Sequence, residues 1–434
     1  MQREHAQGST APGGKDSAAA GAREAGGGRR NMSRTADTVA AVVGAITLAV
    51  AAALPAVWSE PSSAAAPPTE LHLPRVVNAP GTWSNDEGPK GPLAAIALST
   101  RTRPKGLTGK REQFQLFGVS AVDGRSAWIH VPGVDVEDRN LVGWYALSPN
   151  GRWIGWSRER APRGPGANVQ LIGWSVMDTA TGKVRRLADP THRRLRETVA
   201  DIAFSADSRY LLTSYETPRA RRTRGHQFVA WDVHDGTPTV LEKPGHYWLP
   251  NLGSAPTGIV WARQGTVYRQ DLTTGQRSSY AVPQSVVDAS WAPDDTAFAY
   301  IGKPRHRNRA PWRLYAGRTL AEARHHALPL DFDPGQLLGW RDDRHVVVGH
   351  FRSTVRVIDV VTSNVDTIDM TGYGKVLNAP LLAADLWRYP LATPAEPAGT
   401  TDPRTPALWA IGALLAVLAL IVGGRRLRRR REHA

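Results

Sequence analysis

Short runs of alternating hydrophobic and polar residues fill the middle of the chain and are separated by polar turns. The clearest copy spans residues 141–187, where WYALSPNGRWIGWS is followed by LIGWSVMDTATGKVRRL. The first segment turns at residues 148–151 and the second at 181–182. Alternation with a period of two, bounded by Asn-Gly or Thr-Gly, predicts β-hairpins with tight turns. The unit therefore reads as four successive antiparallel strands.

The same turns recur along the chain. The turn of the first hairpin returns at residues 205–208, 292–295 and 341–344. The turn of the second hairpin occurs six times, at intervals of 39 to 58 residues, near Gly124, Gly182, Gly236, Gly275, Arg318 and Thr362. Four-stranded propeller blades repeat about every 40 to 45 residues, with insertions in their loops. The sequence predicts an all-β fold, a six-bladed β-propeller with a seven-bladed one as the alternative.

Two segments with strand character, residues 73–79 and 376–387, fall outside the six units. A ring of sheets has no free edge only if strands from its two ends meet. We therefore expect both segments to share the closing blade, and a seventh blade is the alternative.

Two units carry a resemblance to known repeat proteins. The segments ALSPNGRWIGWS with WSVMDTATGKVRRL, and IAFSADSRYLLTS with VAWDVHDGT, resemble blades of WD40-type and TolB-type β-propellers, including Trp231-Asp232. The resemblance covers roughly residues 75–390 and implies the fold and a binding scaffold. This sequence departs from the WD40 pattern because it has one Trp-Asp dipeptide, no Gly-His signature before it and a compressed fourth unit at residues 258–282.

Both ends of the repeat region lead into apolar segments. Residues 38–58 contain no charge, and residues 407–424 are apolar or small. About 20 such residues span a bilayer as a helix. The predicted organisation is a disordered tail (1–36), a transmembrane helix (37–58), a linker (59–72), the propeller (73–390), a Pro-rich linker (391–406), a second transmembrane helix (407–424) and a basic tail (425–434).

Arginine flanks both apolar segments, at Arg29, Arg30 and Arg34 before the first and from Arg425 onward after the second. Cytoplasmic flanks of membrane spans are rich in Lys and Arg. We therefore expect a cell-membrane protein with both tails cytoplasmic and the propeller outside the cytoplasm. A signal peptide cleaved near residues 64–66 is the alternative for the first segment. The excess of Arg over Lys and the Ala-, Pro- and Gly-rich ends indicate a bacterial genome rich in G and C, and the chain resembles actinobacterial envelope proteins.

The chemistry-bearing residues give no catalytic or metal-binding motif. Cysteine is absent, and no HExxH, Walker A, GxGxxG or GxSxG motif occurs. We expect no cofactor, no metal site and no catalytic residue that sequence alone identifies. Asp178, Asp232, Asp271 and Asp359 occupy equivalent places in four second hairpins. We expect each carboxylate to cap its turn through backbone N–H groups rather than to bind Ca²⁺.

Basic residues cluster in one recurrent place, between the second and third strands of four units. These loops carry 17 basic residues against Glu159 alone, within a net charge of +15. Guanidinium groups bind phosphate and carboxylate. A solvated surface is the alternative to an anion-binding one. The predicted set is Arg101, Arg103, Lys105, Lys110, Arg111, Arg158, Arg160, Arg163, Arg219, Arg221, Arg222, Arg224, Lys303, Arg305, Arg307, Arg309 and Arg313.

These features favour a membrane-tethered, non-enzymatic binding, scaffold or sensing module. The expected partners are the lipid bilayer, through residues 38–58 and 407–424, and an anionic polymer, lipid head group or acidic protein. Nucleic acid is not expected as a partner. The alternative function is a cell-envelope enzyme with its active site on the propeller axis.

Overall fold

The computed structural model describes residues 70–432, apart from residues 82, 85–87, 107–108, 133–144, 161–169, 190–194, 196–201, 217–225, 246–250, 254, 264, 305–309, 351–353, 371–379, 394–401 and 403. The predicted first transmembrane helix, its cleaved alternative and the N-terminal tail lie outside the described residues. Residues 63–409 form one compact unit, and residues 410–434 belong to a second.

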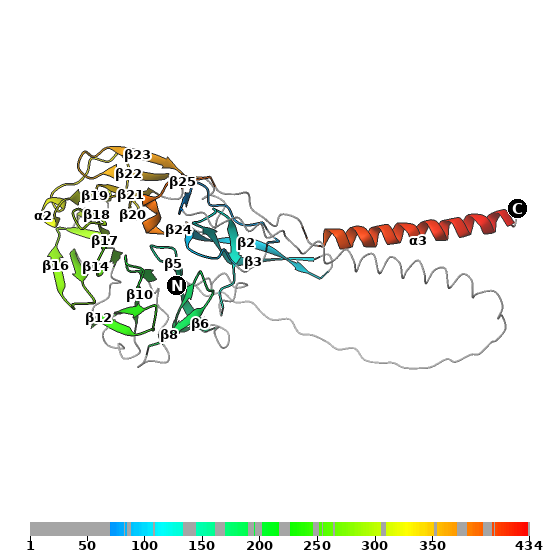
Figure 1. The fold of residues 1–434 in the computed structure, drawn as a ribbon, viewed down its shortest axis with the longest axis horizontal. Coiled ribbons are helices and arrows are strands. Elements are labelled where there is room, and N and C mark those ends of the chain that lie inside the picture. The colour runs from blue at the N-terminus through cyan, green and yellow to red at the C-terminus, as the bar shows by residue number, and fades with distance from the viewer. Residues whose placement is uncertain are drawn as a thin grey trace, which may run out of the picture. The chain divides into compact units, whose positions relative to one another are not determined.

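The described strands of the larger unit form six β-sheets of three or four strands, arranged as a ring (Figure 1). The predicted six-bladed propeller is confirmed. From the first strand outward, blade 1 contains β24 (Leu381–Leu382), β2 (Leu93–Lys105), β3 (Gly109–Ser120) and β4 (Ser126–Ile129). Blade 2 contains β5 (Tyr145–Leu147), β6 (Trp153–Arg160), β7 (Gln170–Asp178) and β8 (Val184–Leu187). Blade 3 contains β9 (Ile202–Phe204), β10 (Tyr210–Glu216), β11 (His226–Asp232) and β12 (Pro238–Gly245).

The remaining blades complete the ring. Blade 4 contains β13 (Asn251–Gly253), β14 (Ile259–Arg263), β15 (Thr266–Gln270) and β16 (Arg277–Ala281). Blade 5 contains β17 (Gln284–Trp291), β18 (Phe298–Pro304) and β19 (Arg313–Gly317). Blade 6 contains β20 (Gln336–Trp340), β21 (His345–His350), β22 (Thr354–Asp359) and β23 (Val365–Asp369). First strands of neighbouring blades contact one another, as β5 does β9 and β17 does β20, so they line the ring's inner side.

The predicted turns of the first hairpins are confirmed in blades 2, 3, 5 and 6. The last turn residue has a positive φ in three of them: +71° at Gly151, +60° at Ser208 and +67° at Asp295. Glycine adopts this left-handed conformation without steric cost, and Asp is among the residues that tolerate it. The N–H of each of these residues donates to the carbonyl three residues earlier, at 2.8 to 2.9 Å.

Blade 5 differs from the repeat because a short helix follows its third strand. The turn near Arg318 leads into α2 (Leu320–Ala323) instead of a fourth strand. The Thr319 hydroxyl accepts a hydrogen bond from the Glu322 N–H at 3.2 Å, and the Glu322 carboxylate accepts one from the Arg318 N–H at 2.7 Å. This reciprocal capping stabilises a helix start. The sequence TLAE carries this capping signal, although the recurring turn pattern predicted a strand hairpin near Arg318 instead.

One of the two closing segments lies where it was expected. In blade 1, β24 from the C-terminal side pairs with β2 through Ala95 and Ile96. The N-terminal segment does not join the blade, because β24 and β4 already cover both edges of the β2–β3 pair. Instead, β1 (Leu73–Pro74) pairs in parallel with β25 (Leu391–Ala392) as a separate two-stranded sheet.

The residues after β24 bind three blades. The N–H groups of Ala383 and Asp385 donate to the carbonyls of Ala94 in blade 1 and of Pro149 in the first turn of blade 2, both at 3.0 Å. The 3₁₀ turn η4 (Ala384–Arg388) presents Trp387, whose indole N–H donates to the Leu338 carbonyl of blade 6 at 3.1 Å. This segment therefore holds the first and last blades together.

Large aromatic side chains fill the spaces between sheets. Trp156, Trp174, Trp231 and Trp261 are essentially inaccessible to solvent. The rings of Trp174 and Trp231 lie 5.5 Å apart across blades 2 and 3, and those of Phe228 and Trp261 lie 5.4 Å apart across blades 3 and 4. Such contacts add to the hydrophobic stabilisation of each interface.

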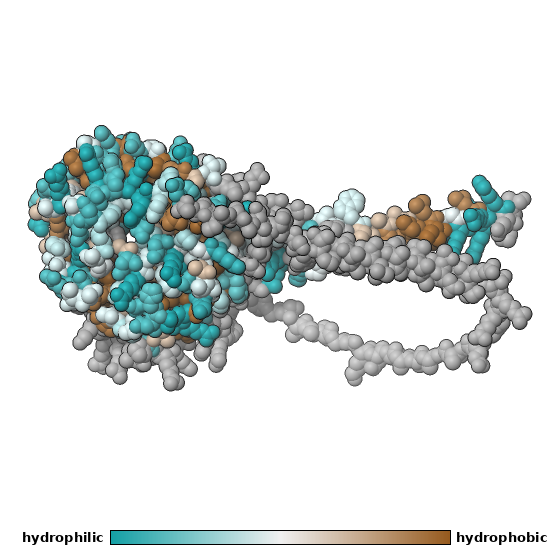
Figure 2. Space-filling model, viewed as in Figure 1, coloured by the Kyte–Doolittle hydropathy of each residue, from teal (hydrophilic) through white to brown (hydrophobic). Residues whose placement is uncertain are grey.

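A single helix in the described residues is long and apolar enough to span a membrane, so one of the two predicted flanking helices is present and the other lies outside the described residues. The helix α3 (Thr405–Glu432) contains the candidate span Leu408–Arg431. It begins two residues before the predicted span and continues through the predicted basic tail, because Arg and Leu are strong helix formers. Figure 2 shows apolar side chains along α3 and hydrophilic ones near its C-terminal end.

The closing contact gives a testable prediction. Trp387 is 3% exposed. Replacing it by Ala should lower the free energy of unfolding of the propeller by about 3 to 5 kcal/mol, because the change leaves a cavity and frees the Leu338 carbonyl. Denaturant unfolding followed by circular dichroism measures the effect. The control is Trp409→Ala, since Trp409 is 76% exposed; equal effects of the two changes would contradict the role of η4.

Candidate functional site

The predicted basic residues lie on equivalent strands of four blades. They flank or occupy the connections β2–β3, β6–β7, β10–β11 and β18–β19, each between the second and third strands of its blade. The structure describes the side chains of Arg101, Arg103, Lys105, Lys110, Arg111, Arg158, Lys303 and Arg313, and the backbone of Arg160. Outside the described residues lie Arg163, Arg219, Arg221, Arg222, Arg224, Arg305, Arg307 and Arg309. Their convergence on one rim stays a prediction.

The described basic residues of blade 1 lie on a projecting ribbon. Strand β24 pairs only with Ala95 and Ile96, and β4 only with residues 116–119. Beyond these residues β2 and β3 continue as a two-stranded ribbon, defined here as residues 99–106 and 109–115, which Figure 1 shows extending from the ring. Lys105, Lys110 and Arg111 are exposed at its end. Arg111 lies directly opposite Arg103, and opposed like charges destabilise a strand pair.

Arg101 differs from its neighbours because it is buried at the base of the ribbon. It is 5% exposed. Its guanidinium donates to Gln115 Oε1 at 3.1 Å and to the Ser84 carbonyl, and it lies 5.3 Å from the centre of the Trp128 ring. The structure therefore places Arg101 in the interior, where it joins the ribbon to the segment before β2, and not on an exposed surface.

The other described members of the set are separate from the ribbon. Burial lowers the pKa of Arg158 below the usual Arg value, and the nearby Arg186 lowers it further. The Lys303 ammonium lies 4.5 Å from the centre of the Trp312 ring, a cation–π contact. Arg313 is exposed at the start of β19.

The four turn aspartates act as expected. Asp178, Asp271 and Asp359 each accept hydrogen bonds from the backbone N–H groups two and three residues later, at 2.7 to 3.2 Å. Asp232 accepts one from His234 at 2.8 Å. The hydrogen bonds from Thr274 and Thr273 hold the pKa of Asp271 below its usual range. The capping interpretation of these residues is confirmed.

Sequence analysis missed the partner of three of these carboxylates. An Arg after the first-hairpin turn forms an ion pair with the Asp that ends the third strand of the same blade. The pairs are Arg152–Asp178 at 3.1 Å, Arg209–Asp232 at 2.8 Å and Arg344–Asp359 at 2.6 Å. The sequence did contain a signal for these pairs, because an Arg ends or directly follows the first-hairpin turn in all three units. These pairs tie the two hairpins of a blade together.

The first strands of the blades carry one titratable group with an unusual environment. Asp288 on β17 accepts a hydrogen bond from the Leu337 N–H on β20 at 2.8 Å, which joins blades 5 and 6. Burial raises the pKa of Asp288 to about 7 although hydrogen bonds from Leu337 and Ala289 lower it. Within the described residues of the six first strands, Asp288 is the one carboxylate.

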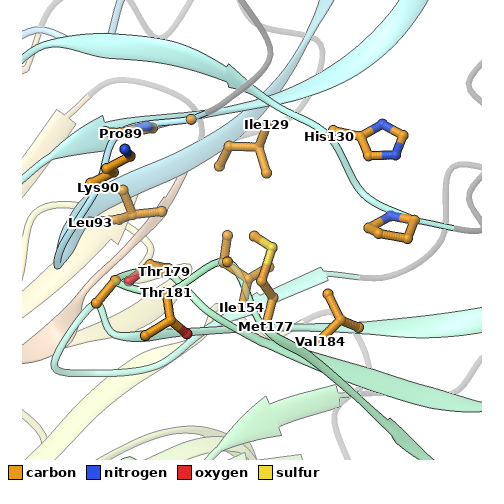
Figure 3. Close-up of a pocket in the computed structure, with 14 residues that line it drawn as sticks. Pro89, Lys90, Leu93, Ile129, His130, Ile154, Met177, Thr179, Thr181 and Val184 are labelled. Carbon is orange, nitrogen blue, oxygen red and sulfur yellow. The ribbon is translucent and has the colours of Figure 1, made fainter.

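A cavity of about 260 Å³ lies between blades 1 and 2 (Figure 3). Apolar side chains, including Leu93, Ile129 and Met177, form most of its wall. Lys90 and His130 bring nitrogen atoms and Thr179 a hydroxyl group. None of the described residues that line the cavity carries a carboxylate. Across the part of the chain that the structure describes, no three His, Cys, Asp or Glu residues gather as metal ligands do.

Comparisons with known proteins yield weak structural likenesses. No protein-family model and no curated relative matches the sequence. The β-propeller domain of the Trilobed protease from Pyrococcus furiosus is 14% identical over 66% of this chain and 84% of that one, with a TM-score of 0.37. Oligogalacturonate lyase from Vibrio parahaemolyticus is 10% identical over 64% and 87%, with a TM-score of 0.38. Dihydro-heme d1 dehydrogenase NirN is 18% identical over 67% and 56%, with a TM-score of 0.39.

Because the Arg–Asp ion pairs need charged carboxylates, they should contribute less to the free energy of unfolding in acid. Burial alone would raise the pKa of Asp359, but hydrogen bonds from Arg344, Thr362 and Val361 outweigh it and hold the pKa below its usual range. The carboxylate therefore stabilises the fold above its unfolded-state pKa of about 3.9, and this contribution is lost as the pH falls through the lower folded-state value. Asp359→Asn should cost about 1 to 2 kcal/mol at pH 7.

Denaturant unfolding at neutral pH and near pH 2 measures this effect. The difference in free energy of unfolding between the parent and Asp359→Asn should narrow in acid, because the carboxylate of the unfolded parent then becomes protonated while that of the folded parent resists protonation. Asp366→Asn on β23 is the control, since Asp366 is exposed, and it should unfold like the parent at both pH values. A gap that stays constant with pH would show that the charge of Asp359 contributes nothing.

Proposed function

We propose that the chain is a membrane-tethered β-propeller in which α3 is the anchor and the propeller is a non-enzymatic binding module. The supporting observation is the exposure of apolar side chains along α3. Leu415 is 61% exposed and Leu420 is 75% exposed. An exposed apolar helix of this length is stable in a bilayer and prone to aggregation in water.

The orientation follows from the charge that ends the span. Arg425, Arg426 and Arg428 to Arg431 follow the apolar residues of α3 directly. Positive flanks remain in the cytoplasm. In our proposal the C-terminal end is cytoplasmic and the propeller lies outside the cytoplasm.

The proposed partner is anionic. Lys105, Lys110 and Arg111 are exposed at the end of the ribbon, and Arg103 lies opposite Arg111 across the strand pair, where like charges repel. An anion bound between such side chains would offset that repulsion. Phosphate and carboxylate groups are the chemistry that guanidinium forks bind best.

A second candidate function, an envelope enzyme with an axial active site, is supported by Asp288. A carboxyl group with a pKa near 7 suits general acid–base catalysis. Asp288 also has a structural role, because it joins β17 to β20. The two candidates differ measurably: Asp288→Asn should abolish an axial activity and should leave binding of an anion at the blade loops unchanged.

The anchor is tested by reporter fusions. A reporter that is active only in the cytoplasm should be active when fused after Ala434, because the Arg-rich end of α3 remains inside. The same reporter inserted in the linker after Ala392 should be silent. The two fusions control for each other's expression. An active fusion after Ala392 would reverse the proposed orientation, and release of the full-length protein by an alkaline wash would refute the anchor.

The binding role is tested with a soluble anion. Polyphosphate should bind the full-length protein in neutral detergent micelles, and its affinity should fall as salt rises, because exposed charges are screened within about 8 Å at physiological ionic strength. Replacing Arg103, Lys105, Lys110 and Arg111 by Glu should abolish the binding. The control is the same number of substitutions elsewhere, at Arg125, Lys183, Arg185 and Arg186. Salt-independent binding, or loss of binding in the control alone, would contradict the proposal.

A further inference from the structure

The segment that leads into α3 is attached to the end of the ribbon. The Arg404 guanidinium donates to the carbonyl groups of Gly106 at 3.3 Å and Gly109 at 2.8 Å. These two glycines flank the tip of the β2–β3 hairpin. The ribbon end and the residue before the helix are therefore held side by side.

Further contacts fix Arg404 in this position. Its side chain forms an ion pair with Asp402 at 2.9 Å and lies 5.4 Å from the centre of the Trp83 ring. Lys110 on β3 lowers the pKa of Asp402, after the larger effect of the Arg404 hydrogen bond. Segments from three parts of the sequence meet here: the residues before β2, the end of the ribbon, and the residues before α3. We call this set of contacts the clamp.

Chain length limits the distance from the clamp to the membrane. Arg404 is four residues before Leu408, where the candidate span begins. Four residues reach at most about 14 Å when extended. The chain is helical from Thr405, so the rise between these residues is about 6 Å. The head-group layer on each side of a bilayer is about 5 to 8 Å thick. Arg404, and with it the ribbon end, must then lie at or next to the head groups.

The side chains at this level suit an anionic membrane surface. Lys105, Lys110 and Arg111 are exposed, and basic residues near an anionic surface are attracted to it. Trp409, at the start of the span, is 76% exposed, and Trp is enriched at membrane interfaces. Within the described residues the other blades have no equivalent: their second strands have five to eight residues, whereas β2 has 13.

We propose that the β2–β3 ribbon is a membrane-contact element, which the Arg404 clamp holds against the bilayer so that Lys105, Lys110 and Arg111 bind anionic lipid head groups. This inference rests on the proposed anchoring by α3. A two-stranded ribbon is marginally stable by itself, so the clamp and the head groups together fix its position. The ribbon thereby sets the distance and tilt of the propeller at the membrane, which a Pro-rich linker alone would leave free.

The test uses the absence of native cysteine. Full-length protein with Glu112→Cys on the ribbon, labelled with a fluorophore, is reconstituted into nanodiscs that contain lipids with a nitroxide on the head group. The matched label is at Ser279→Cys on β16 of blade 4, the blade opposite in the ring; both positions are exposed. The nanodiscs contain either phosphatidylcholine alone or phosphatidylcholine with phosphatidylglycerol.

With phosphatidylglycerol, we expect quenching of the ribbon label to exceed that of the blade 4 label by about threefold and to decrease in high salt. Replacing Lys105, Lys110 and Arg111 by Gln should reduce quenching to the blade 4 level. The same changes at Lys183, Arg185 and Arg186 should not. Arg404→Gln should also reduce quenching of the ribbon label, because the ribbon loses its attachment. Arg404→Lys should reduce this quenching less, since Lys keeps the charge but lacks the planar fork of Arg.

The outcomes separate the two proposals. Protein that fails to enter nanodiscs, or that an alkaline wash removes from liposomes, refutes the anchor. Protein that stays inserted, with equal quenching at both labels, refutes the ribbon proposal alone. Equal quenching of the ribbon label in the two lipid compositions shows that the ribbon is near the bilayer but does not bind anionic head groups, and it overturns the lipid specificity.

Discussion

The structure depends on the pairing of β24 with β2. Each blade of a propeller packs on two neighbours, and an open ring would expose the faces of its first and last sheets as well as the edge of β2. The two residues of β24 come from the far end of the domain and close that edge. The contacts of η4 with Pro149 and Leu338 then hold blade 1 between blades 2 and 6. The buried tryptophans between the other blades keep their packing only while the ring is closed.

Ring closure also brings the two ends of the domain together. Strand β1 pairs with β25, and Trp83 and Arg404 meet at the end of the ribbon. A domain whose entry and exit lie side by side is suited to attachment at one point of a membrane. The Arg404 clamp gives the end of the domain a defined position, because its hydrogen bonds go to backbone carbonyls at the end of a strand pair.

Charge has two distinct roles in this molecule. At the turns, Arg152, Arg209 and Arg344 pair with carboxylates and stabilise individual blades. On the ribbon, Lys105, Lys110 and Arg111 are exposed, and Arg111 opposes Arg103 across the strands. The first group is neutralised within the fold, whereas the second concentrates positive potential at one place. The membrane-contact proposal uses only the second.

The sequence by itself determined the propeller architecture, with six blades and seven as the alternative, together with the first-hairpin turns and the capping role of Asp178, Asp271 and Asp359. These features are local: a turn residue and its alternating neighbours lie within about ten positions, and each signal repeats in several blades. It also indicated the apolar span of α3, because a long uncharged run needs no tertiary context.

Only the tertiary structure decided the features that join distant residues. From the sequence, Arg101 was predicted to be one of the exposed basic loop residues, but it is buried in contact with Ser84 and Trp128. The partners of the turn aspartates lie 15 to 26 residues away. Arg404 reaches a hairpin almost 300 residues earlier in the chain. Composition and periodicity report the local environment of a residue, and contacts across the ring arise only when all six blades are in place.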